Sequence, residues 1–240
     1  MEQFSLSLQV SCEVSYGYDH VSNLSDEVRA LAPTEPATTT RGAESKTNLT
    51  LKAGDLIGYT TGTISAHNWD VLVRNSTERN RFANQDRYES AGDLGSLVIG
   101  DCPYDYFGEE LRNECYSLLS GHGGLREGDD CFVSPDHPRT IAGGWFKEPF
   151  EGFDPGWGLT VGFSAYDQIR IVAEHDSVWV DAGLPTYMDP QTLTEHCYRQ
   201  DGDPDRFVYL KLLSDMERAA AFGQGSCPQQ LPAEYQTYYR

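Results

Sequence analysis

The chain has 240 residues, of which 39% are hydrophobic and 23% charged, a composition typical of a globular protein with a packed core. Its 37 acidic and 18 basic residues give a net charge of −19, and such a surface repels phosphate backbones and anionic membranes. These numbers argue against nucleic acid as a partner, and no apolar run approaches the roughly 20 residues of a membrane span.

The N-terminal part of the chain carries β-strand patterns. Residues 3–16 alternate apolar and polar side chains, which predicts one half-buried strand, and a short helix is expected near residues 26–31. Residues 25–50 are rich in Pro, Thr, Ala and Glu and predict a long exposed loop. Residues 49–59 are typical of a strand, a Gly-Asp turn and a second strand, and residues 68–74 supply a third.

The C-terminal part begins with a helix, predicted at residues 108–120, with Leu111, Cys115, Leu118 and Leu119 on one face. Four short strands follow in RTIAGGWF, WGLTVGFSAY, QIRIVAE and SVWVDAG, separated by Gly, Pro and Asp turns. Residues 207–222 are ambiguous on propensity, and we favour a hairpin with its turn at Ser214-Asp215 over a helix.

The predicted fold class is mainly β. We expect an antiparallel β-sandwich or barrel-like N-terminal domain at residues 1–100 and a linker with one connecting helix at residues 101–121. A second, small β-rich domain is expected at residues 122–240.

Six cysteines, at positions 12, 102, 115, 131, 197 and 227, form no CxxC pair and no cluster with histidine. Disulfides are therefore favoured over a metal site, and they predict a secreted, periplasmic or cell-surface protein. Six thiols allow 15 pairings, and spacing does not select one. Cys102 with Cys115 and Cys197 with Cys227 are the local candidates.

Three N-terminal motifs occur in order: Tyr16-Gly-Tyr-Asp-His-Val-Ser, Leu51-Lys-Ala-Gly-Asp-Leu-Ile-Gly-Tyr, and Ser65-Ala-His-Asn-Trp-Asp-Val-Leu-Val. Together they resemble motifs of the lysostaphin and LytM-like zinc endopeptidases, which carry the duplicated hybrid motif. The resemblance covers about the first third of the chain. It implies that the N-terminal domain has the lysostaphin-type endopeptidase fold.

The resemblance also implies a degenerate metal site. His20 and His67 match two family histidines that flank the zinc-bound water, whereas Trp69 stands where the family has a zinc ligand. Indole cannot coordinate a metal, and the 19 residues before His20 contain no histidine to match the remaining ligands. His20 and His67 are therefore vestigial catalytic candidates that we expect to converge, and Tyr18 and Trp69 are candidate binding residues.

Two weaker site candidates lie outside the resemblance. Asp201, Asp203 and Asp205 alternate like the opening of a calcium loop, but Arg206 and Leu212 stand where such a loop needs glycine and a closing acid. An acidic turn is the favoured interpretation. The tryptophans could stack on sugar rings if exposed, although their strand patterns favour burial; those considered are Trp145, Trp157 and Trp179.

The sequence thus favours a secreted, non-catalytic binding or surface-assembly protein without a cofactor, whose partner is a protein, peptide or glycan at the cell exterior. One alternative is a zinc metalloendopeptidase or peptidoglycan hydrolase whose ligands come from other positions, such as His122, His137 or His175. Another is a structural subunit of an extracellular filament.

Overall fold

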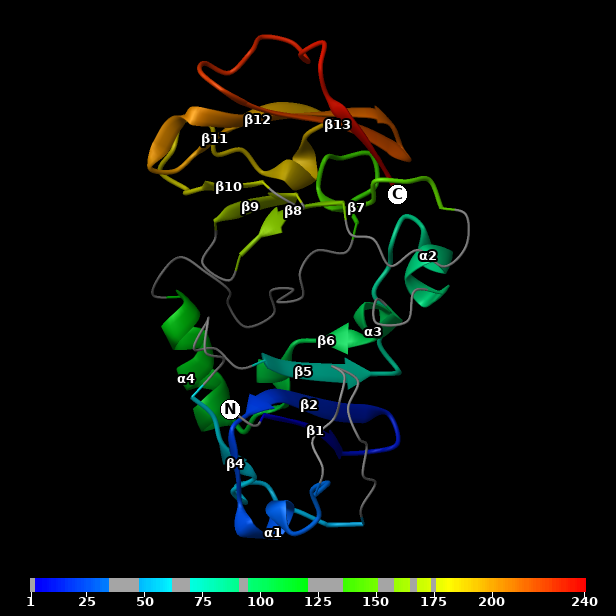
Figure 1. Cartoon of the computed structure of the whole chain (residues 1–240), viewed down its shortest axis with the longest axis vertical. Coiled ribbons are helices and arrows are strands. Elements are labelled where there is room, and N and C mark those ends of the chain that lie inside the picture. The colour runs from blue at the N-terminus through cyan, green and yellow to red at the C-terminus, as the bar shows by residue number, and fades with distance from the viewer. Residues whose placement is uncertain are drawn as a thin grey trace. The chain divides into compact units, whose positions relative to one another are not determined.

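A computed structural model of the chain (Figure 1) describes residues 3–34, 48–61, 70–90, 95–120, 136–150, 158–164, 168–173 and 176–240. In these ranges the protein is mainly β, its strands pair antiparallel, and its sheets do not close into a barrel. None of the helices described has the length and apolarity to cross a membrane.

The chain divides into two compact units, Met1–Asn75 and Ser76–Arg240, so residues 76–100 group with the C-terminal part. The domain boundaries proposed after residues 100 and 121 stay predictions.

The N-terminal unit is built on an antiparallel sheet in which three strands follow the order β1-β2-β5. Phe4, Leu6 and Leu8 of β1 are half-buried and alternate with exposed serines, as expected for a sheet with one covered face. A short ribbon and one helical turn complete the described part of the unit. The bounds are β1 (Phe4–Gln9), β2 (Val14–Val21), β3 (Asn23–Leu24), α1 (Asp26–Arg29), β4 (Gly58–Tyr59) and β5 (Asp70–Asn75).

Two strand predictions in this unit were wrong in extent. Residues 3–16 are not one strand, because the Ser11 hydroxyl accepts hydrogen bonds from the Glu13 and Val14 amides and turns the chain between β1 and β2. In the stretch 49–59 only Gly58–Tyr59 is a strand, since the Asp55 carboxylate accepts a hydrogen bond from the Lys52 amide and holds a turn instead. The helix near residues 26–31 and the strand ending at residue 74 were found as α1 and β5.

The second unit opens with short helical elements, of which the sequence predicted only the longest. The single connecting helix was therefore an incomplete prediction. The bounds are α2 (Gln85–Ser90), α3 (Gly95–Val98), β6 (Gly100–Asp101), η2 (Pro103–Tyr106) and α4 (Glu109–Ser120).

The helix α4 has the predicted extent but not the predicted buried face. Leu111 and Leu118 are 49% and 67% exposed, whereas Tyr116 is buried. Tyr116 packs edge-on against Tyr104 of η2, with 5.7 Å between ring centroids, and its hydroxyl donates to Asp105. Contact with η2 therefore decides which side of the helix is covered.

The rest of the second unit is a β-sandwich of two antiparallel four-stranded sheets, β10-β9-β8-β7 and β11-β12-β13-β14 (Figure 1). One core cluster draws on both sheets and includes Trp145, Ile171, Val178, Val208 and Leu210, each 0% exposed. The predicted hairpin is confirmed by the pairing of Ser214 with Glu217. The bounds are β7 (Gly143–Trp145), β8 (Leu159–Phe163), β9 (Ile169–Ala173), β10 (Ser177–Val180), η3 (Pro190–Thr192), β11 (Glu195–Gln200), β12 (Asp203–Ser214), β13 (Glu217–Gln224) and β14 (Gln236–Tyr239).

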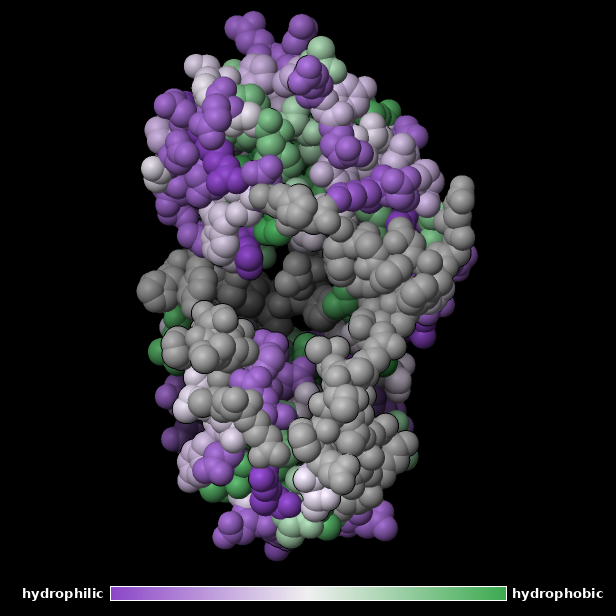
Figure 2. Space-filling view, viewed as in Figure 1, coloured by the Kyte–Doolittle hydropathy of each residue, from purple (hydrophilic) through white to green (hydrophobic). Residues whose placement is uncertain are grey.

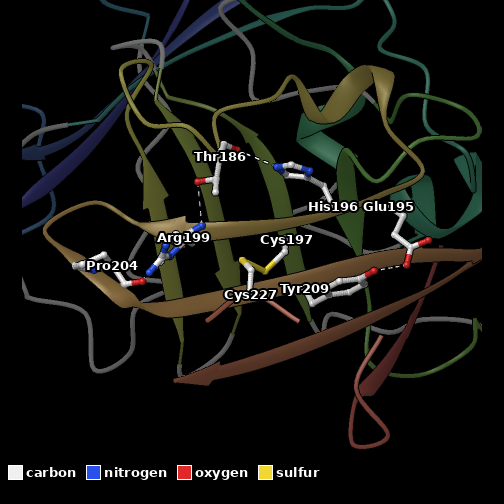
Figure 3. The surroundings of a disulfide bond; sticks show 8 residues. All are labelled: Thr186, Glu195, His196, Cys197, Arg199, Pro204, Tyr209 and Cys227. Atoms are coloured by element: carbon white, nitrogen blue, oxygen red, sulfur yellow. Dashed lines mark hydrogen bonds between the residues drawn. A yellow bond between two sulfur atoms is a disulfide. The ribbon is translucent and has the colours of Figure 1, made fainter. Parts of the chain in front are cut away.

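The predicted disulfide Cys197–Cys227 is present, with 5.9 Å between the Cα atoms. It lies on the outer face of the β11–β14 sheet, beside Tyr209 of the neighbouring strand, while His196 points away toward Thr186 (Figure 3). Half-buried Leu231 and the two disulfide sulfurs pack with Phe207 and Tyr209, so the bond fastens the C-terminal loop over this face.

The pairing of Cys102 with Cys115 was wrong. Cys115 is a free thiol, whereas Cys102 is disulfide-bonded. The Cys102 sulfur lies 3.4 Å from the Tyr116 hydroxyl, and Cys115 precedes Tyr116 on α4, so its side chain points about 100° away around the helix. Cys12 is free and exposed.

Candidate binding site

The N-terminal sheet contains a β-bulge at His20. Phe4 pairs with Val21 and Leu6 pairs with Tyr18, so Asp19 and His20 of β2 together lie opposite the single residue between Phe4 and Leu6. His20 has φ +64°, in the left-handed region. A bulge with one left-handed residue re-aims a side chain, and backbone strain of this kind gathers at functional sites.

The His20 imidazole is held from both of its nitrogens. Nδ1 lies 3.0 Å from the side-chain oxygen of Gln3, and Nε2 lies 3.6 Å from a carboxylate oxygen of Asp70, the first residue of β5. The His20 side chain is 33% exposed to solvent and the Asp70 side chain is 50% exposed. The ring is therefore positioned by its neighbours while one part of it still faces solvent.

The backbone of the bulge is fixed as well. The Thr60 hydroxyl donates a 2.6 Å hydrogen bond to the His20 carbonyl, and the Ser22 amide donates to the Tyr59 carbonyl at 2.9 Å. The segment at β4 thus holds the bulge in place, although Thr60 and His20 are 40 residues apart in the sequence. A left-handed histidine costs about 1–2 kcal/mol relative to a right-handed conformation, and these contacts offset that cost.

Tyr18 lies two residues before His20 on β2 and was predicted as a binding residue. Its ring stacks on Tyr16 with 6.0 Å between centroids, and partial burial raises the pKa of its phenol. Tyr18 therefore belongs to the half-covered face of the sheet and stays protonated at neutral pH.

Several predicted site residues cannot be placed beside His20. His67 and Trp69 lie outside the described residues, so their convergence with His20 stays a prediction. His122, His175 and Trp157 lie outside them too. His137 is described, in the second unit, where its carbonyl accepts hydrogen bonds from Thr140 and Arg240.

The acidic turn predicted as a weak calcium candidate does not gather its carboxylates. Asp203 and Asp205 lie within β12, whereas Asp201 lies beside Asp181, and hydrogen bonding with Asp181 raises the pKa of Asp201. Across the described ranges no group of three or more His, Cys, Asp or Glu side chains is placed to hold a metal ion.

The two described tryptophans that were considered for sugar stacking differ. Trp145 is 0% exposed and belongs to the sandwich core, so it cannot meet a ligand at the surface. Trp179 is half-buried on β10, and the Arg170 guanidinium covers its ring at 4.2 Å from the centroid. The described surface of this side of the molecule is mostly hydrophilic (Figure 2).

Sequence reasoning missed the residues that hold His20, namely Gln3, Thr60 and Asp70. Asp70 lies within the third motif, directly after Trp69, and pairs with Asp19, so the strand register was the signal that could have found it. Gln3 and Thr60 carried no signal of their own. Comparisons with known protein families, with curated proteins and with solved structures find no match to this chain.

Proposed function

We propose that the protein is a non-catalytic binding protein of the cell exterior, whose N-terminal unit derives from a lysostaphin-type endopeptidase. In this proposal the bulge at His20 binds a peptide or glycan. The observation that carries it is the left-handed His20, whose imidazole is fixed by Gln3 and Asp70 yet partly faces solvent. A purely structural histidine at this position would gain nothing from the strain.

The chemistry of the site suits recognition of polar groups. Imidazole donates or accepts hydrogen bonds, the Asp70 carboxylate accepts them, and the nearby Tyr18 ring offers an apolar surface. Peptide amides and sugar hydroxyls present matching donors and acceptors. The tryptophan at position 69, where the resembled family has a zinc ligand, supports binding over hydrolysis.

The compartment is supported by the disulfide Cys197–Cys227, because such bonds persist in oxidising environments. The acidic surface is suited to a soluble partner of neutral or positive charge.

Co-sedimentation with insoluble peptidoglycan, which offers both peptide and glycan, tests the proposal. We expect saturable binding that falls at least tenfold in His20→Gly. Glycine tolerates the left-handed conformation, so the free energy of unfolding should stay within about 1 kcal/mol of the parent value.

Arg139→Gly is the matched control, because Arg139 is the other described non-glycine residue with positive φ, at +59°. It should leave binding unchanged. Equal binding by the His20→Gly protein would remove the site. Bound zinc with hydrolysis of a glycyl peptide would instead establish the peptidase alternative, and ordered polymers under the electron microscope would establish the filament alternative.

A further inference from the structure

The core of the β-sandwich contains two buried arginines that share one tryptophan. Arg218 of β13 is 0% exposed and Arg240 is 3% exposed. Their guanidinium carbons lie 4.4 and 4.0 Å from the centre of the Trp145 ring. Buried arginine is rare unless each charge is compensated, so the partners of these two groups need to be accounted for.

Backbone carbonyls of the segment before β7 hold one end of each guanidinium group. Nη1 of Arg218 donates to the Ile141 carbonyl, and Nη2 of Arg240 donates to the Ala142 carbonyl at 2.5 Å. Nη2 of Arg240 also lies 3.2 Å from the His137 carbonyl and 3.4 Å from that of Thr140. Carbonyl dipoles orient both cations, but they carry no net negative charge.

The carboxylate present is committed to Arg240 and the backbone. Asp136 accepts hydrogen bonds from the Ala83 and Gly144 amides, both at 2.9 Å, and lies 4.0 Å from Nε of Arg240. Burial raises the pKa of Asp136 and lowers that of Arg218, and the neighbouring Arg240 lowers the pKa of Arg218 further. Around Trp145, the described residues therefore place two buried cations against one buried carboxylate.

Arg218 also has two buried donor atoms without acceptors. Its Nε and Nη2 atoms are buried and have no hydrogen-bond partner within the described part of the protein, and the same holds for Nε1 of Trp145. Nε and Nη2 form the side of the guanidinium fork that grips an anion with two parallel hydrogen bonds. A buried guanidinium whose Nε and Nη2 donors lack acceptors is strongly unfavourable unless an anion accepts their hydrogen bonds.

We propose that Arg218 binds a small monovalent anion of the halide class, enclosed in the sandwich core. Nε and Nη2 of Arg218 are the donors to the ion. The ion balances the second cation beside Trp145 and so fastens β13 to the segment that leads into β7. This site is separate from the bulge at His20 and does not depend on the proposed function.

The surroundings favour a halide over a larger anion. Trp145, Tyr198 and Tyr238 belong to the same packed core cluster and are at most 5% exposed. A close-packed interior of this kind excludes anions as large as phosphate or sulfate, so the proposed ion is monatomic. Water could satisfy the donors, but it would leave the charge of Arg218 uncompensated.

Thermal and urea unfolding of the full chain, with sodium chloride replaced by sodium gluconate at constant ionic strength, tests the proposal. Above the dissociation constant, each tenfold rise in chloride should multiply the folding equilibrium constant about tenfold. Arg218→Met should abolish this dependence. Arg170→Met removes an exposed arginine that also stacks on a tryptophan, so it is the matched control and should keep the dependence.

Crystals of the unaltered protein soaked in sodium bromide provide a second measurement that needs no variant. The expected result is an anomalous peak within hydrogen-bond distance of Nε and Nη2 of Arg218. Stability that does not depend on the anion would overturn the proposal, and so would bromide found at the surface only.

Discussion

The two units of this protein use the same strand pattern to different ends. In the N-terminal unit the sheet has one covered face, and Leu72 on β5 remains 42% exposed. In the C-terminal unit two sheets enclose a core in which Leu210 and Trp145 are fully buried. The half-covered sheet carries the strained His20, whereas the sandwich holds the disulfide and the stacked arginines. The strained backbone and the exposed apolar side chain thus lie in the unit whose sheet is less tightly packed.

Truncation of one leucine in each unit should give the largest contrast between them. Leu210→Ala removes a fully buried side chain and should lower the free energy of unfolding by about 2–5 kcal/mol, because the lost burial is joined by a cavity. Leu72→Ala makes the same chemical change at a half-open strand and should cost less than about 1 kcal/mol. Urea denaturation followed by circular dichroism measures both. Similar losses would show that the N-terminal sheet is covered as fully as the sandwich.

The next effect concerns the disulfide Cys197–Cys227, which lies in the sandwich. Cys197 and Cys227 are separated by 30 residues, so replacing both with alanine should destabilise the second unit by about 2–4 kcal/mol through the freed unfolded chain. Cys12→Ala, at an exposed free thiol of the first unit, is the control and should have no measurable effect. Differential scanning calorimetry with and without reductant would follow both. A reductant that left the melting curve of the parent protein unchanged would contradict this expectation.

The sequence predicted elements well where the pattern was local. The alternation of Val178, Trp179 and Val180 identified β10, and the Ser214-Asp215 turn identified the β12–β13 hairpin. It failed where a single polar side chain decides the path of the chain. The Ser11 hydroxyl divides residues 3–16 into two strands, although their apolar alternation continues through the turn.

The candidate site was predicted only in part. The motif around His20 pointed to that residue, but the bulge depends on how β2 pairs with β1, which strand alternation cannot show. The arginines around Trp145 were missed because alternation assigns a charged residue to the surface, and Arg218 instead occupies an inward position of β13. A buried charge is compensated by groups that are distant in the sequence, so it leaves no periodic pattern there.

The smallest predicted effect concerns Asp181 and Asp201 at the exposed margin of the sandwich. Substitutions there should cost little stability, as at the exposed positions of the N-terminal sheet. Hydrogen bonding with Asp181 and its like charge raise the pKa of Asp201, so the folded protein holds this proton more tightly than the unfolded chain does. The stabilisation that protonated Asp201 gives the folded protein is therefore present at acid pH and is lost as pH rises through the pKa of Asp201 in the folded protein.

Asp201→Asn keeps a hydrogen-bond donor to Asp181 and removes the repulsion. It should raise the unfolding midpoint slightly at pH 7 and leave it unchanged below about pH 3.9, the ordinary value for aspartate. Asp203→Asn, two residues away and exposed, is the control and should change little at either pH. Melting curves at the two pH values test this, and a gain that was equal at both would mean that the Asp181–Asp201 contact is not its source. Calcium added to the parent protein is a second test. An ion that bridged the two carboxylates would relieve the same repulsion as the substitution and would raise the unfolding midpoint at pH 7.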